Sequence, residues 1–449
     1  MKNLTIRNII AVCGGRWLGP ADGLEREISS VTTDSRTVTQ DCLFAAIPGE
    51  RVDGHTFVEA ALGQGALCAL VQQVPEGVSG NLLFVPDTVA ALQKLAAFYR
   101  QQFDIPVIGI TGSVGKTTAK EMVAAVLQQR YRVHKTAGNF NNDLGVPITL
   151  FGLNDTHEAA VVEMGVSHPG DMARLAEMVR PTMSLFTIIG HAHLEFLKSR
   201  EGILKEKSVV NGYLPEDGTV FCSGDDDLLA AMSCQQEKIT FGLGDDCALL
   251  ALNVETLSGG TMRCTVSGMG RQFEVSIPAY GDHMIYAALE GAAVGIRFGL
   301  SDAEIAAGIA DYEAVGHRAR RLTGEKLTVI DDCYNANPTS TASALRSLSH
   351  EKGRKVCILG DMLELGDDSA RLHYETGLLA KDCGMDLVLA QGEAAAEIAR
   401  GAGNLGIHFS RKSELLDALP ALIRTGDTVL VKASRSMRFE EITEALLKL

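Results

Sequence analysis

Residues 107–118, VIGITGSVGKTT, constrain the fold of this chain more than any other segment. The β-branched run predicts a buried strand that breaks into a glycine turn, and from Thr117 onward the apolar residues recur at helical spacing. A strand, a glycine loop and a Lys-Thr pair at a helix start form a phosphate cradle, in which backbone amides and the helix N-terminus attract anions. Lys116 would neutralise charge, and the Thr117 hydroxyl can hold Mg²⁺. The alternative is a glycine turn that merely leads into an ordinary helix.

We therefore expect an α/β chain that binds a nucleoside triphosphate. The spacing departs from the strict phosphate-loop pattern, because Ile110 stands where the first glycine is usual and Gly112 makes the turn. The predicted nucleotide-binding residues are Gly112, Ser113, Val114, Gly115, Lys116, Thr117 and Thr118.

Length and charge narrow the class of protein. A chain of 449 residues is too long for one core, and about three domains are expected. Apolar runs stay well short of the roughly 18 residues of a membrane helix, and no secretory signal is evident. The net charge of −15 argues against a general affinity for nucleic acid or anionic membranes, and ten scattered cysteines without a C-x-x-C pair suggest free thiols in the cytoplasm.

Strands and helices alternate along most of the chain, which predicts parallel sheets built from βαβ units. Residues 219–280 are instead β-rich, and a helix follows at 283–295. Ligands of such sheets bind beyond the carboxyl ends of the strands. Charged groups stand at those ends: the phosphate loop, Glu163, the segment 190–195 after a strand at 184–189, and the segments 331–332, 360–361 and 432–435.

Glu163 ends an apolar strand, where a phosphate-loop protein usually keeps an acidic residue for Mg²⁺; the alternative is a helix-capping glutamate. His191, His193 and Glu195 are a weak zinc signal. We favour one histidine near a second Mg²⁺, and a structural histidine pair stays open.

Lys207 shares the apolar face of its helix with Ile203, Val210 and Leu214, whereas Lys205 faces away. An ammonium group is unfavourable there, and carbamylation by CO₂ would convert the amine into a carboxylate that can ligate a metal. The alternative is a lysine that extends along an apolar surface. The asparagine-rich run 136–147 is either a plain loop or a group of amides that orient phosphate or peptide oxygens.

Several segments together resemble one family. TDSR at 33–36, LFAA at 43–46 and DGHTF at 53–57 look like a uridine-nucleotide domain, and TGSVGKTT, NFNNDLGVP, VVEMG and GHAHLEF look like a central ATPase. DDCYNANP at 331–338 and LGDMLELG at 359–366, followed by His373, are the most specific. With these motifs the chain resembles the Mur ligases of bacterial cell-wall synthesis over nearly its whole length, and within them the branch that adds D-alanyl-D-alanine.

The resemblance implies three domains: residues 1–80 for a UDP-linked sugar peptide, 81–314 for ATP, and 315–449 with a Rossmann-like fold. It implies that Lys116 contacts the β- and γ-phosphates. Metal ligands would be Thr117 and Glu163 for a first Mg²⁺, and His193 with carbamylated Lys207 for a second. Arg318 and Asp332 would reach ATP. The substrate-binding residues would be Ser35, Arg36, Asp53, Gly54, His55, Asn139, Asn141, Asn142, Tyr334, Asn335 and Asn337.

The same resemblance implies ATP- and Mg²⁺-dependent ligation of D-alanyl-D-alanine to a UDP-N-acetylmuramoyl-tripeptide, through an acyl phosphate, by a cytoplasmic monomer with small-molecule substrates. One alternative is another Mur-type or folylpolyglutamate-type ligase that adds a single amino acid. A phosphate-loop switch or transport ATPase is a more distant alternative, since such proteins usually place Asp rather than Glu at the second strand end.

Overall fold

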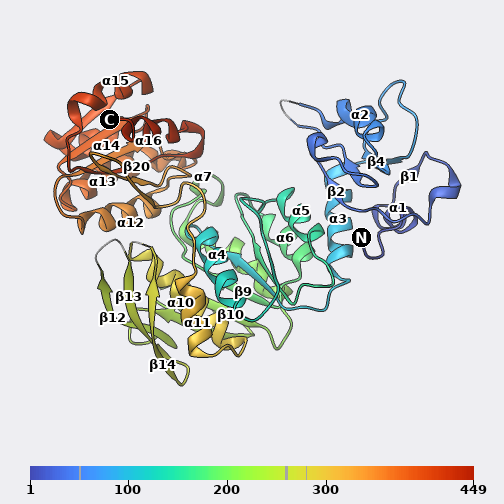
Figure 1. The fold of residues 1–449 in the computed structure, drawn as a ribbon, viewed down its shortest axis with the longest axis horizontal. Helices are drawn as coiled ribbons and strands as arrows, with labels where there is room; N and C mark the ends of the chain where they lie inside the picture. Colours follow the sequence, from blue (N-terminus) through green and yellow to red (C-terminus); the bar gives the residue numbers. More distant parts are fainter. Residues whose placement is uncertain (50–51, 258–260, 280) are drawn as a thin grey trace.

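The computed structural model describes residues 1–49, 52–257, 261–279 and 281–449. Within these ranges the chain forms three α/β units, each built on its own sheet, which confirms the predicted fold class. We call them the N-terminal unit (strands β1–β5), the central unit (β6–β14) and the C-terminal unit (β15–β20). Figure 1 shows the N-terminal unit, in blue, and the C-terminal unit, in orange and red, on opposite sides of the central unit.

The sheet of the N-terminal unit has the strand order β1-β5-β4-β3-β2, parallel except for β1. Strand β5 hydrogen-bonds to β4, so the expected boundary at residue 80 would cut a strand away from its own sheet. We therefore propose that this unit extends at least through β5. Its elements are α1 (Ile6–Cys13), β1 (Arg16–Trp17), β2 (Val31–Thr32), β3 (Leu43–Ala45), α2 (Val58–Gly63), β4 (Cys68–Val71) and β5 (Leu82–Phe84), with 3₁₀ helices η1 (Ala21–Gly23), η2 (Ser35–Thr37) and η3 (Gly54–Phe57).

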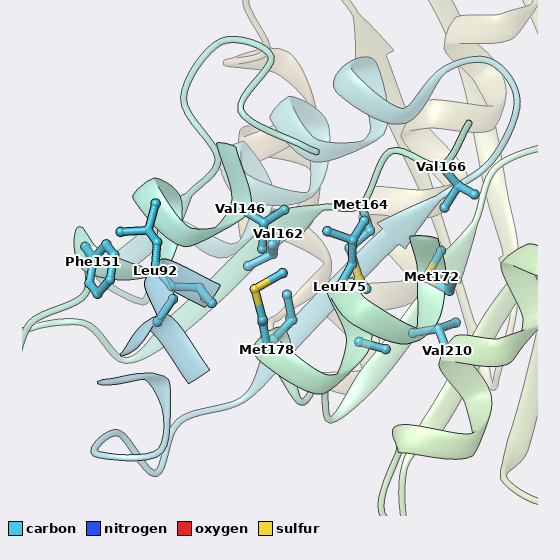
Figure 2. Close-up of a cluster of buried hydrophobic side chains, with 14 of the residues drawn as sticks. Leu92, Val146, Phe151, Val162, Met164, Val166, Met172, Leu175, Met178 and Val210 are labelled. Atoms are coloured by element: carbon cyan, nitrogen blue, oxygen red, sulfur yellow. The ribbon is translucent and has the colours of Figure 1, made fainter. Parts of the chain in front are cut away.

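Helix α3 (Thr88–Arg100) joins this unit to the central one. It begins at the N-cap Asp87, whose side chain accepts a hydrogen bond from the amide of Ala90. Its buried face, including Leu92, packs against apolar side chains of the central unit (Figure 2). In that figure Leu92 lies beside Phe151, with Val162 and Met178 in the same cluster. This shared core extends from Leu4 through Val210 to Leu372, so buried apolar side chains connect the N-terminal, central and C-terminal units.

The central sheet has the order β14-β13-β12-β11-β10-β9-β6-β8-β7. Strands β6 to β12 pair in parallel and β12 to β14 antiparallel, so the β-rich segment predicted after residue 219 extends the same sheet. Its strands are β6 (Val107–Thr111), β7 (Val133–Lys135), β8 (Ala159–Glu163), β9 (Met183–Phe186), β10 (Thr219–Ser223), β11 (Glu237–Gly242), β12 (Leu249–Thr256), β13 (Met262–Gly268) and β14 (Arg271–Ile277).

Helices cover both faces of that sheet. Helices α4, α10 and α11 share one apolar cluster with the strands, while α5 and α6 belong to the cluster shared with α3. The helices are α4 (Lys116–Leu127), α5 (Gly145–Phe151), α6 (Asp171–Val179), α7 (Leu194–Leu197), α8 (Arg200–Lys207), η4 (Ser208–Tyr213), α9 (Asp227–Ala231), α10 (His283–Arg297) and α11 (Asp302–Ala310).

The sheet of the C-terminal unit has the order β15-β16-β20-β17-β18-β19, parallel except for β15. Its parallel strands carry helices on both faces, as expected for a Rossmann-like unit. The elements are β15 (Arg320–Thr323), β16 (Thr328–Asp331), α12 (Pro338–Ser349), β17 (Lys355–Gly360), η5 (Gly366–Asp368), α13 (Ser369–Asp382), β18 (Leu387–Gln391), α14 (Ala396–Ala402), η6 (Gly403–Leu405), β19 (Gly406–Phe409), α15 (Lys412–Leu422), β20 (Thr428–Lys432), η7 (Arg435–Met437) and α16 (Glu440–Leu446). Among the described helices, none combines the length and apolar character needed to cross a bilayer.

Candidate active site

The phosphate loop lies between β6 and α4, as its sequence predicts. Gly112 and Gly115 have φ values of 147° and 87°, which side chains rarely adopt. A Cβ atom at Gly112 would lie 1.9 Å from Thr187 Oγ1. Lys116 Nζ donates a hydrogen bond of 2.7 Å to the Gly112 carbonyl, so its ammonium group curls back over the loop.

The strand predicted at 184–189 is shorter in the structure, because β9 ends at Phe186. The following residues leave the sheet to brace the phosphate loop: the Ser113 amide donates to the Ile188 carbonyl at 2.8 Å, and Thr187 Oγ1 donates to the Val114 carbonyl at 2.5 Å. The loop is thus held by the neighbouring strand end.

Glu163 faces the start of helix α4. Register places Ile110 of β6 opposite Glu163 of β8, at the carboxyl ends of both strands. Thr117 Oγ1 donates to Glu163 Oε2 at 2.9 Å, and Asn141 Nδ2 donates to Glu163 Oε1 at 2.7 Å. A buried hydroxyl and a buried carboxylate are hard oxygen ligands side by side, so this pair suits Mg²⁺.

A buried ion chain that we did not predict supports Glu163. Lys120, fully buried on α4, lies 2.9 Å from Glu121 and 4.0 Å from Glu163, and Lys135 lies 2.5 Å from Glu121. These two ammonium groups hold the pKa of Glu121 below its usual range against the opposing effect of burial. Lys120 follows Lys116 by one helical turn, and this spacing in the sequence places both lysines on the same face of α4.

Lys207 is buried on the predicted apolar face, with 1% exposure, together with Ile203 and Val210. Burial, followed by repulsion from Lys116, drives the pKa of Lys207 well below its ordinary value. Its neighbour Glu206 is engaged elsewhere, since its carboxylate accepts from backbone amides at the start of α6. Among the described residues, no hydrogen bond or ion pair involves the Lys207 amine.

The two histidines after β9 contact the C-terminal unit. His193 Nδ1 lies 2.5 Å from Glu364 Oε2, and the backbone amide of His191 donates to Thr339 Oγ1 at 3.1 Å. In the described part of the chain, no hydrogen bond or ion pair links His193 to Lys207. Glu364 was not predicted, since 171 residues separate it from His193.

Arg318, in the segment before β15, contacts Tyr334, which follows β16. The Arg318 guanidinium carbon lies 3.8 Å from the centre of the Tyr334 ring, and that of Arg435 lies 5.7 Å from it. Burial, countered by Glu163, lowers the pKa of Lys116, and Arg318 lowers it further.

Asp332 is positioned from both sides. Its Oδ2 lies 2.5 Å from Nζ of the buried Lys432, and its Oδ1 accepts from the Ala319 amide at 3.1 Å. Lys432 ends β20, and its role was not predicted beyond its place at a strand end.

Other predicted substrate residues serve the local backbone in this structure. Asn337 caps α12 with Ser340, Asn335 Oδ1 accepts from the Ala336 amide, and Asn142 Oδ1 accepts from the Gly145 amide. Asn139 is exposed. Of the three asparagines in that loop, only Asn141 touches the predicted metal ligands.

In the N-terminal unit, Arg36 is exposed and its guanidinium is held by both carboxylate oxygens of Asp34 beside Ser35. His55 is buried instead: its Nε2 accepts from the Gln72 amide at 3.0 Å, so Nδ1 carries the proton donated to Asp53 at 2.6 Å. The Gly54 amide completes this loop by bonding to the Ile47 carbonyl. Asp53, Gly54 and His55 thus hold the shape of this segment, and their contact with substrate stays a prediction.

Comparison with known proteins matches three segments of the chain to one family. Residues 27–100 match the catalytic-domain model of the Mur ligase family, 110–295 the Mur ligase middle domain, and 317–435 the Mur ligase glutamate ligase domain. The UDP-N-acetylmuramoyl-tripeptide–D-alanyl-D-alanine ligase of Bacillus subtilis is 38% identical over 100% of this chain and 99% of its own length. That of Escherichia coli is 37% identical over 95% and 96%.

Solved structures agree with these relatives. MurF from Acinetobacter baumannii superposes with a TM-score of 0.91 at 30% identity and covers 99% of each chain. MurF ligase from Thermotoga maritima, solved in complex with ADP, has a TM-score of 0.84 at 27% identity and covers 93% of this chain and 97% of its own. Sequence, site and fold agree, and the chain belongs to the Mur ligase family.

Proposed function

We propose that the chain joins D-alanyl-D-alanine to a UDP-N-acetylmuramoyl-tripeptide in peptidoglycan synthesis, with ATP converted to ADP and phosphate. The observation that carries this proposal is the pairing of Thr117 with Glu163 beneath a lysine-bearing phosphate loop. The relatives that match the chain from end to end bear the name of this activity.

The reaction needs ATP because a carboxylate resists attack by an amine. An oxygen of the tripeptide's terminal carboxylate attacks the γ-phosphorus, the bond from that phosphorus to the β,γ-bridging oxygen breaks, and ADP leaves. The amine of D-alanyl-D-alanine then attacks the carbonyl carbon of the acyl phosphate, loses a proton, and phosphate departs. Phosphoryl transfer asks mainly for positioning and charge neutralisation.

The phosphate loop and its neighbours supply that neutralisation. Lys116 would exchange its bond to the Gly112 carbonyl for the β- and γ-phosphates, and the amides of residues 112–118 would face the same oxygens. Thr117 and Glu163 would hold Mg²⁺, which draws charge from the phosphate oxygens. Asn141 keeps the Glu163 carboxylate oriented.

A second Mg²⁺ would require Lys207 and His193. The support is the Lys207 amine itself, which is buried, carries a strongly lowered pKa and thus favours the neutral form that reacts with CO₂. Carbamylation adds the carbon of CO₂ to the amine nitrogen with loss of one proton, and produces a carboxylate. For His193 to join it, the contact with Glu364 must be exchanged.

Substrates would enter from both flanks. Arg36 and Ser35 offer a guanidinium and a hydroxyl to the uridine nucleotide, and Tyr334 with Arg318 and Asp332 faces the loop from the other side, near the dipeptide and ATP. Since the flanking units lie on opposite sides of the central unit (Figure 1), we propose that they approach each other during turnover and exclude water from the acyl phosphate. We also propose that the protein acts as a cytoplasmic monomer.

The test is phosphate release from ATP in the presence of the UDP-linked tripeptide and one amine acceptor at a time. We expect turnover with D-alanyl-D-alanine and little with single amino acids. Turnover with glutamate or another single amino acid instead would assign a different ligase, and hydrolysis that needs neither substrate would indicate a switch or transport ATPase.

A further inference from the structure

A compact cluster of side chains that can ligate a metal borders the site described above, since its residues are the sequence neighbours of Arg318, Asp332 and Tyr334. The buried carboxylate of Asp331, at the end of β16, accepts from the thiol of Cys333 at 2.9 Å through Oδ1 and pairs with His317 Nδ1 at 2.6 Å through Oδ2. One ligand atom from each of the three residues lies within 4.8 Å of the others.

The donor set selects a particular class of cation. Thiolate and imidazole favour Zn²⁺ and similar borderline-soft ions, whereas Mg²⁺ prefers oxygen ligands alone. Three protein ligands with a fourth position left for water form a familiar zinc arrangement. Asp331 and Cys333 are almost fully buried, and the His317 side chain, 41% exposed, offers an entry path.

The cluster also lies where the central unit is connected to the C-terminal unit. His317 belongs to residues 311–319, the linker between α11 of the central unit and β15 of the C-terminal unit. The Tyr334 amide already donates to the His317 carbonyl at 3.1 Å, and the adjacent Arg318 stacks on the Tyr334 ring. A ligand that binds His317 to Asp331 and Cys333 would therefore fasten the linker to the end of β16.

We propose that His317, Asp331 and Cys333 form a Zn²⁺ site that fixes the interdomain linker, separate from the Mg²⁺ site at Thr117 and Glu163. On binding, the Cys333 thiol loses one proton to solvent, while the neutral His317 ring moves its proton from Nδ1 to Nε2. One proton is thus released for each ion bound.

The test uses the full chain, free of nucleotide, titrated with Co²⁺ as a spectroscopic substitute and then with Zn²⁺. We expect a thiolate-to-Co²⁺ absorption band that Zn²⁺ abolishes and that excess Mg²⁺ leaves unchanged. Cys333→Ser should lose the band, and His317→Gln should weaken binding by at least roughly tenfold, the smallest loss typical even of residues that only orient a ligand. Cys383→Ser, which removes a partly exposed thiol of the same unit, is the matched control.

Calorimetry in buffers of different ionisation enthalpy should report one proton released per Zn²⁺, and hydrogen exchange of residues 317–319 should slow on binding. The absence of a thiolate band in the unmodified chain, or a band that survives in Cys333→Ser, would overturn the site. Binding without slower exchange would overturn its action on the linker. If Cys333→Ser does not fold, His317→Gln decides, since that side chain is partly exposed and unaltered Zn²⁺ affinity in it would refute the proposal.

Discussion

Replacing Glu163 by glutamine should separate the folding role of this side chain from its chemical one. Glu163 accepts hydrogen bonds from Thr117 at 2.9 Å and from Asn141 at 2.7 Å in a buried place. A glutamine can keep both: its carbonyl accepts from Thr117, and its amide donates to Asn141 once that side chain turns over. What is lost is the charge.

The two substitutions at this position can be compared in free energy. Glu163→Ala leaves the Thr117 hydroxyl and the Asn141 amide without an acceptor, at about 1–3 kcal/mol each, or roughly 2–6 kcal/mol of unfolding free energy. Glu163→Gln exchanges two charge-assisted hydrogen bonds for neutral ones, a loss of roughly 1–3 kcal/mol. Activity should fall by at least about 10²–10³-fold in both, since each removes charge from the metal site.

Denaturant midpoints and Mg²⁺-dependent phosphate release measure the two effects. The control is Glu177→Gln, an exposed carboxylate on α6, which should leave both unchanged. Wild-type turnover in Glu163→Gln would refute the metal role. Equal midpoints for the Ala and Gln variants would refute the hydrogen-bond argument.

Four further outcomes are expected. Lys116→Ala should abolish ligation with an unchanged circular dichroism spectrum, because the lysine bonds only within its own loop; near-normal turnover would contradict its assignment. Lys207→Ala should be inactive and partly rescued by short-chain carboxylic acids, and full wild-type activity in CO₂-depleted buffer together with no rescue would remove the carbamate. Gly112→Ala should weaken ADP binding in calorimetry, since the new Cβ meets Thr187 Oγ1 and the φ of 147° is strained; wild-type affinity would count against this. Burial holds the pKa of His373 below its unfolded value of about 6.5. The contribution of His373 to the free energy of unfolding should therefore be fully present above about pH 6.5, fall as the pH drops below that value, and stop changing below the folded pKa. The free energy of unfolding of His373→Gln should differ less between pH 5 and pH 8 than that of the wild type. An equal difference would show that His373 does not contribute to this pH dependence.

The nucleotide half of the site could be predicted because its signals are local. A strand, a turn and a helix start within twelve residues define the phosphate loop. The parallel pairing of β6 with β8, which places Glu163 opposite Ile110, then brings Glu163 to the loop. The apolar face that carries Lys207 followed from helical spacing alone, and its burial is confirmed. Periodicity reports which face a helix buries.

Contacts between distant parts of the chain could not be predicted in this way. The bond of His193 to Glu364 and the shortened strand β9 depend on tertiary packing. Asn337 is different: its position before a proline and three residues ahead of Ser340 is a helix-capping pattern, so its structural role was readable from local sequence. Which sheet a strand as short as β5 joins depends on tertiary pairing, so the boundary at residue 80 stays a prediction.

The bracing of the phosphate loop by residues 187 and 188 has a consequence for regulation. Ordering a loop around a ligand costs about 1–2 kcal/mol of backbone entropy per residue, and here folding has already met that cost. Because the loop is ordered before a nucleotide arrives, neither ATP nor ADP bears that cost, and both should bind the same loop conformation and compete for it. Accumulated ADP would then slow ligation, and precursor supply would fall as energy reserves are depleted.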